Sequence, residues 1–156
     1  LPTDLLALME QEVIDAALDS VEPAVGAPPI RNARAVALRA EAFLRRALED
    51  PIHIEDVCEA VGTSRPSLHA AFQTAFGTSP MAYWRSLRLS AARKDLERAR
   101  RGTTVADVAV KWGFFRLGYF SGDYRAMFGE SPSETLKRAR GRAAPVARPQ
   151  LPGGPS

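Results

Sequence analysis

The chain carries the same helical pattern twice, at residues 54–80 and again at residues 103–132. In each copy a short set of apolar residues at helical spacing ends at a glycine, Gly62 or Gly113, and a second apolar set follows. Glycine adopts a left-handed backbone angle at little cost, so each copy predicts a helix, a tight turn and a second helix. Two copies are too few for a solenoid, which needs about three or more repeats. The sequence therefore predicts two helix-turn-helix units inside one compact domain.

The two copies align residue by residue, except that the later copy has one extra residue after its turn. The inward positions of the second helices pair Leu68 with Phe120, Phe72 with Tyr124, and Phe76 with Phe128. Met127 joins the predicted inward set of the later helix. We interpret the aromatic residues as core rather than as base-stacking groups, because they keep the same helical register in both copies.

Helical patterns also flank and join the two copies, so the predicted fold class is all-α. We expect helices at residues 32–49, 80–98 and 133–140, and the second of these is a long strut between the copies. The predicted organisation is an amphipathic N-terminal helix at 1–20, a Pro- and Gly-rich linker at 21–31, the double helix-turn-helix domain at 32–140, and a disordered tail at 141–156.

Charge is unevenly distributed along the chain. Residues 1–30 hold six acidic residues and no Lys or Arg, whereas residues 31–142 hold 20 Lys and Arg against 12 Asp and Glu. A basic surface on a doubled helix-turn-helix suits a polyanionic partner such as DNA, although a solvated, Arg-rich surface would give the same count.

The sequence contains no apolar run near the roughly 18 residues of a membrane span and no signal-peptide pattern. The chain begins at Leu1, so we expect it to be cut from a longer protein. A lone cysteine, Cys58, cannot form an internal disulfide, which fits a reducing compartment.

Catalytic chemistry finds little support in the sequence. The His and Cys residues are His53, Cys58 and His69, and they match no standard zinc spacing. Cys58 occupies the place of Ala109 in the repeat, which favours a packing role. No Gly-rich phosphate loop or paired acidic site is present, so we expect no enzyme activity, no metal and no cofactor.

Several motifs in combination resemble the AraC/XylS family of bacterial transcription regulators. They are Arg88-Leu89-x-x-Ala92-Arg93, Val108-Ala109-x-x-x-Gly113-Phe114, Tyr119-Phe120 and Phe128-Gly129-x-Ser131-Pro132. The resemblance covers residues 32–140. It implies a domain of about seven helices that places two recognition helices in successive major grooves. It also implies an upstream effector-binding or dimerising domain, of which residues 1–20 would be the last helix.

The outward positions of the two predicted recognition helices differ. Those of the second are Leu117, Gly118, Ser121 and Gly122, and the two glycines can read nothing through side chains. We expect base reading mainly from the first unit, through Arg65, His69 and Gln73, with Leu117 and Ser121 added from the second. Arg65 suits guanine, Gln73 suits adenine, and Leu117 can touch a thymine methyl group.

Contacts to the DNA backbone are expected from both units. The candidates are Ser64, Ser67, Lys111, Arg116 and Arg125. Ser64 is expected first of all to cap its helix. Arg88 and Arg93, on the strut, could either bind phosphate or brace the strut, and the sequence leaves both roles open.

The predicted function is therefore a sequence-specific, DNA-binding transcription regulator in the bacterial cytoplasm, associated with the nucleoid. It would recruit RNA polymerase as an activator or block it as a repressor, and activation is the expectation. Expected partners are double-stranded DNA, RNA polymerase and a second copy of the chain, which would bind through the upstream domain or residues 1–20. The alternative is a protein-binding module that keeps the helix-turn-helix fold but has lost specific DNA reading.

Overall fold

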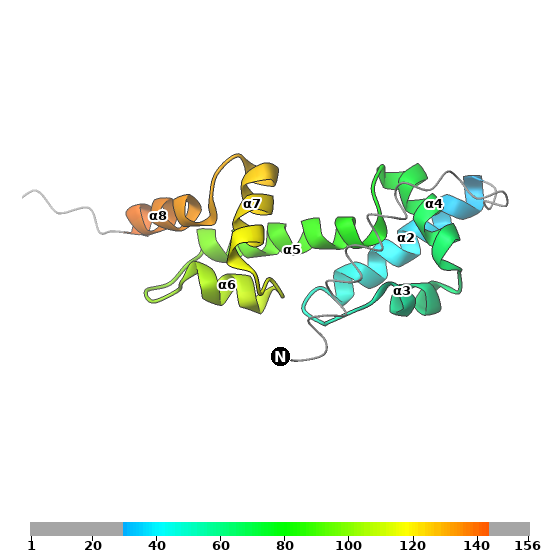
Figure 1. Ribbon diagram of the computed structural model, residues 1–156, viewed down its shortest axis with the longest axis horizontal. Helices are drawn as coiled ribbons and strands as arrows, with labels where there is room; N and C mark the ends of the chain where they lie inside the picture. The colour runs from blue at the N-terminus through cyan, green and yellow to red at the C-terminus, as the bar shows by residue number, and fades with distance from the viewer. Residues whose placement is uncertain (1–29, 144–156) are drawn as a thin grey trace, which may run out of the picture.

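The computed structural model describes residues 30–143, and this part of the chain is entirely helical (Figure 1). Its seven helices are α2 (Ile30–Arg46), α3 (Ile54–Val61), α4 (Arg65–Phe76), α5 (Pro80–Glu97), α6 (Val105–Lys111), α7 (Leu117–Phe128) and α8 (Pro132–Ala143). The predicted all-α fold of about seven helices is confirmed. The helix predicted at 1–20, residues 21–29 of the linker and residues 144–156 of the tail lie outside the described residues.

Three predicted boundaries differ from the structure. Helix α2 begins at Ile30, inside the predicted linker, and α8 continues to Ala143, into the predicted tail. A single glycine, Gly141, costs a helix only about 1 kcal/mol, and the good helix formers beside it let α8 continue. Helix α2 ends at Arg46 rather than at 49, and in the turn that follows the carbonyls of Leu48 and Asp50 accept hydrogen bonds from a side chain of α5.

The helices form two groups at the two ends of α5, which runs between them (Figure 1). Helices α2, α3 and α4 enclose the first core with Trp84 from the start of α5. Helices α6, α7 and α8 enclose the second core with Leu89, Ala92 and Leu96 from the rest of α5. The chain thus builds one core for each helix-turn-helix unit, and α5 contributes to both.

The turns and helix starts follow the residues predicted to make them. Gly62 and Gly113 both have positive φ, 68° and 78°, between the helices of the two units. Ser64 accepts a hydrogen bond from the backbone N–H of Ser67 and caps α4, as predicted. Thr104 and Asp107 form a capping box at the start of α6, in which each side chain accepts from the other residue's backbone N–H.

One predicted core residue is wrong. Phe120 and Tyr124 are fully buried and Phe128 is partly buried, but Met127 is 44% exposed. Residues 120, 124 and 128 recur every four positions and form one stripe, whereas Met127 lies about 100° around the helix from its neighbour Phe128. The buried hydroxyls of Tyr124 and Thr135 are hydrogen-bonded at 2.9 Å, which ties α7 to α8.

Candidate nucleic-acid interface

The first recognition helix, α4, presents its predicted base-reading residues beside a fixed N-terminus. The hydroxyl of Ser64 donates to the hydroxyl of Ser67 at 2.9 Å, so the two predicted phosphate contacts lie together where the helix begins. The unpaired backbone N–H groups of a helix N-terminus attract anions, which makes this end suitable for a phosphate.

Three outward residues follow along α4. Arg65 and His69 are half-buried, while Gln73 is exposed. The Arg65 guanidinium lies 3.6 Å from the carboxylate of Glu55 on α3, so a base or phosphate that binds Arg65 would compete with that carboxylate. Gln73 is one turn further along, and its amide can donate and accept at once, which an adenine edge requires.

The second recognition helix, α7, presents an apolar and small-residue surface. Leu117 is exposed, Ser121 is half-buried, and a Cβ added at Gly118 or Gly122 would meet nothing within 4 Å. Phe115 and Tyr119, at the start of the helix, are also exposed, and Tyr119 is the more so at 64%. Leu117 and Ser121 are therefore the side chains that this helix offers to a base edge, with Tyr119 beside them.

Tyr119 is a candidate contact that the sequence analysis did not single out. Its ring lies beneath the guanidinium of Arg116, whose Cζ is 5.2 Å from the ring centroid. The sequence could have predicted that Tyr119 is exposed, because it falls outside the buried stripe formed by Phe120, Tyr124 and Phe128.

The predicted cationic contacts of the second unit are held by protein partners to different degrees. The Lys111 ammonium donates to Asp95 at 2.7 Å, and this bond raises the pKa of Lys111. Arg125 lies 3.3 Å from the carboxylate of Glu134, with both side chains more than half exposed. Exposed ion pairs of this kind contribute only about 0–1 kcal/mol to stability. A phosphate can therefore replace the carboxylate partner of Lys111 or Arg125 at a small cost in free energy.

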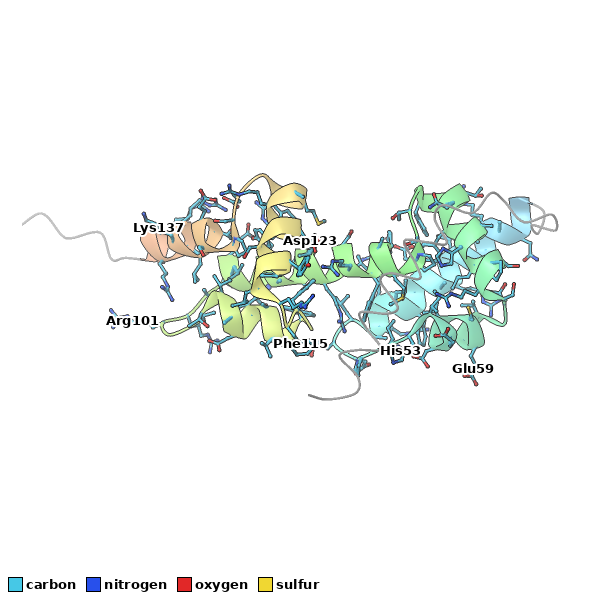
Figure 2. All side chains as sticks on the ribbon, in the orientation of Figure 1. His53, Glu59, Arg101, Phe115, Asp123 and Lys137 are labelled. Carbon is cyan, nitrogen blue, oxygen red and sulfur yellow. The ribbon has the colours of Figure 1, made fainter. Side chains whose placement is uncertain are left out.

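A further ion pair fixes α7 on the strut. The guanidinium of Arg85, on α5, donates through Nε to the carboxylate of Asp123 at 2.8 Å and also through Nη2. Figure 2 shows Asp123 where α7 lies beside α5. Since Asp123 lies in the middle of α7, this pair adds a fixed contact between the second recognition helix and α5, beside the packing of Phe120 and Tyr124 in the second core.

Arg88 and Arg93 brace the strut. Arg93 lies 3.0 Å from Glu97 and 3.6 Å from Glu130, and its guanidinium is 4.6 Å from the ring centroid of Phe128. Arg88 is buried and donates to two backbone carbonyls. Of the two roles that the sequence left open, the structure therefore supports bracing for both side chains.

The described residues show no sign of a metal site. Within residues 30–143, no group of three or more His, Cys, Asp or Glu side chains is placed to hold an ion. Cys58 is half-buried, and burial raises the pKa of its thiol, which makes it less reactive.

No helix in this part of the chain has the length and apolar character that crossing a membrane requires.

The site residues thus fall on two surfaces at opposite ends of α5. Arg65, Ser67, His69 and Gln73 belong to α4 and Ser64 caps it, whereas Leu117, Ser121 and Arg125 belong to α7 and Arg116 precedes it. Lys111 ends α6, next to the second turn. Which of these side chains touch DNA stays a prediction.

Comparisons with known proteins agree with this architecture. A family model described as "Helix-turn-helix domain" matches residues 57–138, more than half of the chain. The crystal structure of a probable AraC family transcriptional regulator from Rhodopseudomonas palustris is similar to this chain with a TM-score of 0.65 at 40% identity, covering 67% of this chain and 97% of that one.

Curated proteins of similar sequence are longer than this chain. A probable thc operon regulatory protein from Rhodococcus erythropolis is 40% identical over 96 residues, which make up 61% of this chain and 29% of that protein. A XylDLEGF operon transcriptional activator from Pseudomonas putida is 34% identical over 99 residues, 63% of this chain and 30% of that protein. The chain thus spans about three tenths of the length of these two relatives.

The family match covers nearly all of both helix-turn-helix units and the strut between them, and the similar solved structure has the same fold. These matches are to regulators rather than to enzymes. The chain belongs to the AraC/XylS family of helix-turn-helix DNA-binding domains.

Proposed function

We propose that residues 30–143 are the sequence-specific DNA-binding part of a transcription regulator, with α4 and α7 entering successive major grooves. The observation that carries this proposal is the construction of two helix-turn-helix units, each with its own core, on one continuous helix. Helix α5 has 18 residues, so it spans about 27 Å at 1.5 Å per residue.

That span can be compared with the DNA. Successive turns of a major groove are about 34 Å apart along the duplex. Where the two recognition helices lie closer than that, the duplex has to bend, at a cost of order 1–6 kcal/mol for a site of this size. A bent site is therefore part of the proposal.

Base reading is assigned mainly to the first unit and backbone contact mainly to the second. Helix α4 offers Arg65, His69 and Gln73, which have polar groups for base edges. The second unit offers the cations Lys111, Arg116 and Arg125, and its base contacts are Leu117 and Ser121. The support is the composition of the two surfaces, since α7 carries two glycines where α4 carries larger residues.

The complete protein would act on transcription from this site. Because one relative is named an operon transcriptional activator, we propose activation, through contact with RNA polymerase at a neighbouring promoter. A second copy would bind through an upstream domain or residues 1–20. DNA binding would place the protein on the bacterial nucleoid, in the cytoplasm.

Selection of bound DNA from a random library tests the proposal. The protein should recover one two-part site, and Gln73→Ala should relax the preference at one position by about 1–3 kcal/mol, which is roughly 5- to 150-fold. Arg125→Ala should instead weaken binding to all sequences and lower the slope of log affinity against log salt by about one phosphate contact.

A matched control is Lys137→Ala, which removes an exposed cation from α8, outside the predicted contacts. Binding without any preferred sequence, or no binding at low salt, would favour the alternative of a protein-binding module.

A further inference from the structure

Arg88 lies in the middle of α5, between the two cores, and is only 8% exposed. Among residues 32–142 it is the one charged side chain that is buried. Burial lowers the pKa of Arg88 to about 10, so the group remains charged at neutral pH. A buried charge is costly, and a well-packed apolar side chain of similar size is often at least as stabilising, so stability alone does not explain an arginine here.

The guanidinium is bonded firmly to the first unit. Its Nε donates to the carbonyl of Leu48 at 2.9 Å and its Nη2 to the carbonyl of Asp50 at 2.7 Å. Both carbonyls belong to the turn that leads from α2 into α3. The guanidinium also lies over the ring of Trp84, a residue of the first core, with Cζ 3.5 Å from the ring centroid.

The same guanidinium touches the turn of the second unit. A Cβ built on Gly113 would lie 2.4 Å from Nη1 of Arg88, so this nitrogen occupies the space beside the glycine. Gly113 stands between α6 and α7, at the joint that sets the direction of the second recognition helix. One planar group therefore bonds to the entry of the first unit and packs against the turn of the second.

Few other contacts join the units. In the described part of the chain, the extensive helix–helix contacts either lie within one unit or involve α5. Leu48, in the same turn that Arg88 bonds, is the residue that packs against both cores. The relative orientation of the units thus depends on α5, on the ion pair of Arg85 with Asp123, and on this small joint of Leu48, Asp50, Arg88 and Gly113.

We infer that Arg88 is a positioning residue: it fixes the orientation of the second helix-turn-helix unit against the first, and so sets the separation of the two DNA elements that the protein reads together. The second half of this inference rests on the proposed function. The planar fork of the guanidinium suits the role, because it holds two carbonyls along fixed directions while its third nitrogen faces Gly113. A lysine, with one compact charge on a flexible stem, cannot reproduce these directions.

The first test measures, without DNA, how narrowly the distance between α4 and α7 is defined. In a Cys58→Ala background, spin labels are placed on exposed positions of α4 and α7 through Ala75→Cys and Ala126→Cys. The label-to-label distance distribution should be single and narrow in the parent protein and broader or displaced in Arg88→Lys. Circular dichroism of the same samples checks that both units remain folded.

The control is Arg93→Lys, which changes an arginine of the same helix whose ion pairs, with Glu97 and Glu130, stay at the second unit's end. It should leave the distance distribution unchanged. A folded Arg88→Lys protein with the parent distribution would overturn the inference, whatever the protein does with DNA.

The second test uses the two-part DNA site recovered by the parent protein. Moving its halves apart by one base pair shifts the second half by about 3.4 Å and rotates it by about 35°. The parent protein should lose about tenfold or more in affinity for such a site, as for a disrupted base contact. Arg88→Lys should keep the same base preference in each half but lose much of this discrimination.

The outcomes of the second test are distinguishable from one another. If the parent protein recovers no preferred site, the proposed function fails while the distance measurement still decides the role of Arg88. If the parent protein recovers a two-part site and Arg88→Lys discriminates spacing equally well, the inference on Arg88 is wrong and the proposed function stands.

Discussion

The two helix-turn-helix units share their inward residues and differ in almost everything that faces outward. Both second helices bury residues at every fourth position, Leu68 and Phe72 in α4 and Phe120 and Tyr124 in α7. The first unit, residues 54–76, carries three carboxylates and one arginine, whereas residues 105–128 carry two carboxylates and three cations. The comparison shows that core packing constrains the residue types on the inward stripe of each helix. It does not constrain the outward face, where the residues can differ between the units and serve binding.

The two turns differ in what lies beside them. Gly62 and Gly113 have similar left-handed backbone angles, but a Cβ on Gly62 would meet nothing within 4 Å, whereas one on Gly113 would meet Arg88. The first glycine therefore serves the backbone of its own unit alone. The second also leaves room for a side chain that bonds to the other unit.

The two recognition helices also begin differently. Ser64 caps α4 through its side chain, while Arg116 occupies the same position before α7 without a capping bond. The extra residue of the second unit lies just ahead of this position. It allows Phe114 to turn inward, where its ring lies 4.9 Å from that of Phe120. The second unit therefore fixes the start of its helix by aromatic packing rather than by a cap.

The largest expected difference between the units is in their turns. Gly62→Ala should lower the free energy of unfolding by about 1–2 kcal/mol, because an alanine is strained at positive φ. Gly113→Ala should cost about 1–3 kcal/mol more, because the displaced guanidinium would give up its hydrogen bonds to the carbonyls of Leu48 and Asp50. Urea unfolding of both variants measures the difference. Equal losses would mean that Arg88 moves aside freely and that the turns are equivalent.

Substitutions at the two helix starts should have different effects: one should lower stability and the other should weaken DNA binding. Ser64→Ala removes a cap and should destabilise the protein by about 1 kcal/mol. Arg116→Ala removes no capping bond and should change stability by less than about 0.5 kcal/mol, as exposed substitutions commonly do. In a salt titration of DNA binding, Arg116→Ala should lower the slope by about 0.9 if it contacts one phosphate. A loss of stability as large as that of Ser64→Ala would contradict the difference drawn between the two starts.

A reciprocal exchange tests the outward faces. In the alignment of the two copies, Ala70 of α4 corresponds to Gly122 of α7. Gly122→Ala should stabilise the protein by about 0.5–1 kcal/mol, because the site is helical and the added methyl group meets nothing. Ala70→Gly should destabilise it by about 1 kcal/mol.

Thermal unfolding measures both changes of this exchange. The control is Gly141→Ala, since this glycine of α8 also faces open space. A loss of stability in Gly122→Ala would show that the glycine has a structural purpose in its own unit.

The duplicated core was predictable from sequence because it depends on short-range periodicity. The pairing of Leu68 with Phe120 and of Phe72 with Tyr124 gave the helices, the turns and the buried stripe, and all four residues are fully buried. The caps at Ser64 and Thr104 were equally local, since a cap involves residues only three apart. The prediction that Met127 is buried was wrong, because apolar character alone does not say whether a residue lies on the buried stripe or beside it.

The joint between the units was not predictable in the same way. Arg88 bonds to carbonyls about forty residues earlier in the chain, and no pattern in the sequence pairs an arginine with a backbone atom. For the same reason the ion pair of Arg85 with Asp123 and that of Lys111 with Asp95 emerged only from the structure. The candidate DNA contacts could be named from sequence as outward positions, but their protein partners could not.

The smallest expected effect concerns how acid acts on the two units. The carboxylate of Glu130 accepts hydrogen bonds from Arg138 and Thr135, which together with nearby arginines lower its pKa from 4.5 to about 2. A carboxyl whose pKa is lowered by folding contributes stability above its unfolded pKa, and that stability is lost as pH falls toward the folded value. Part of the acid sensitivity between about pH 4.5 and 2 should therefore come from Glu130.

Glu130→Gln should flatten the dependence of unfolding free energy on pH in this window, measured by urea unfolding at a series of pH values. Glu59→Gln, which removes an exposed carboxylate from the first unit, is the matched control and should keep the parent slope; if both variants flatten it equally, acid acts through overall charge and not through Glu130.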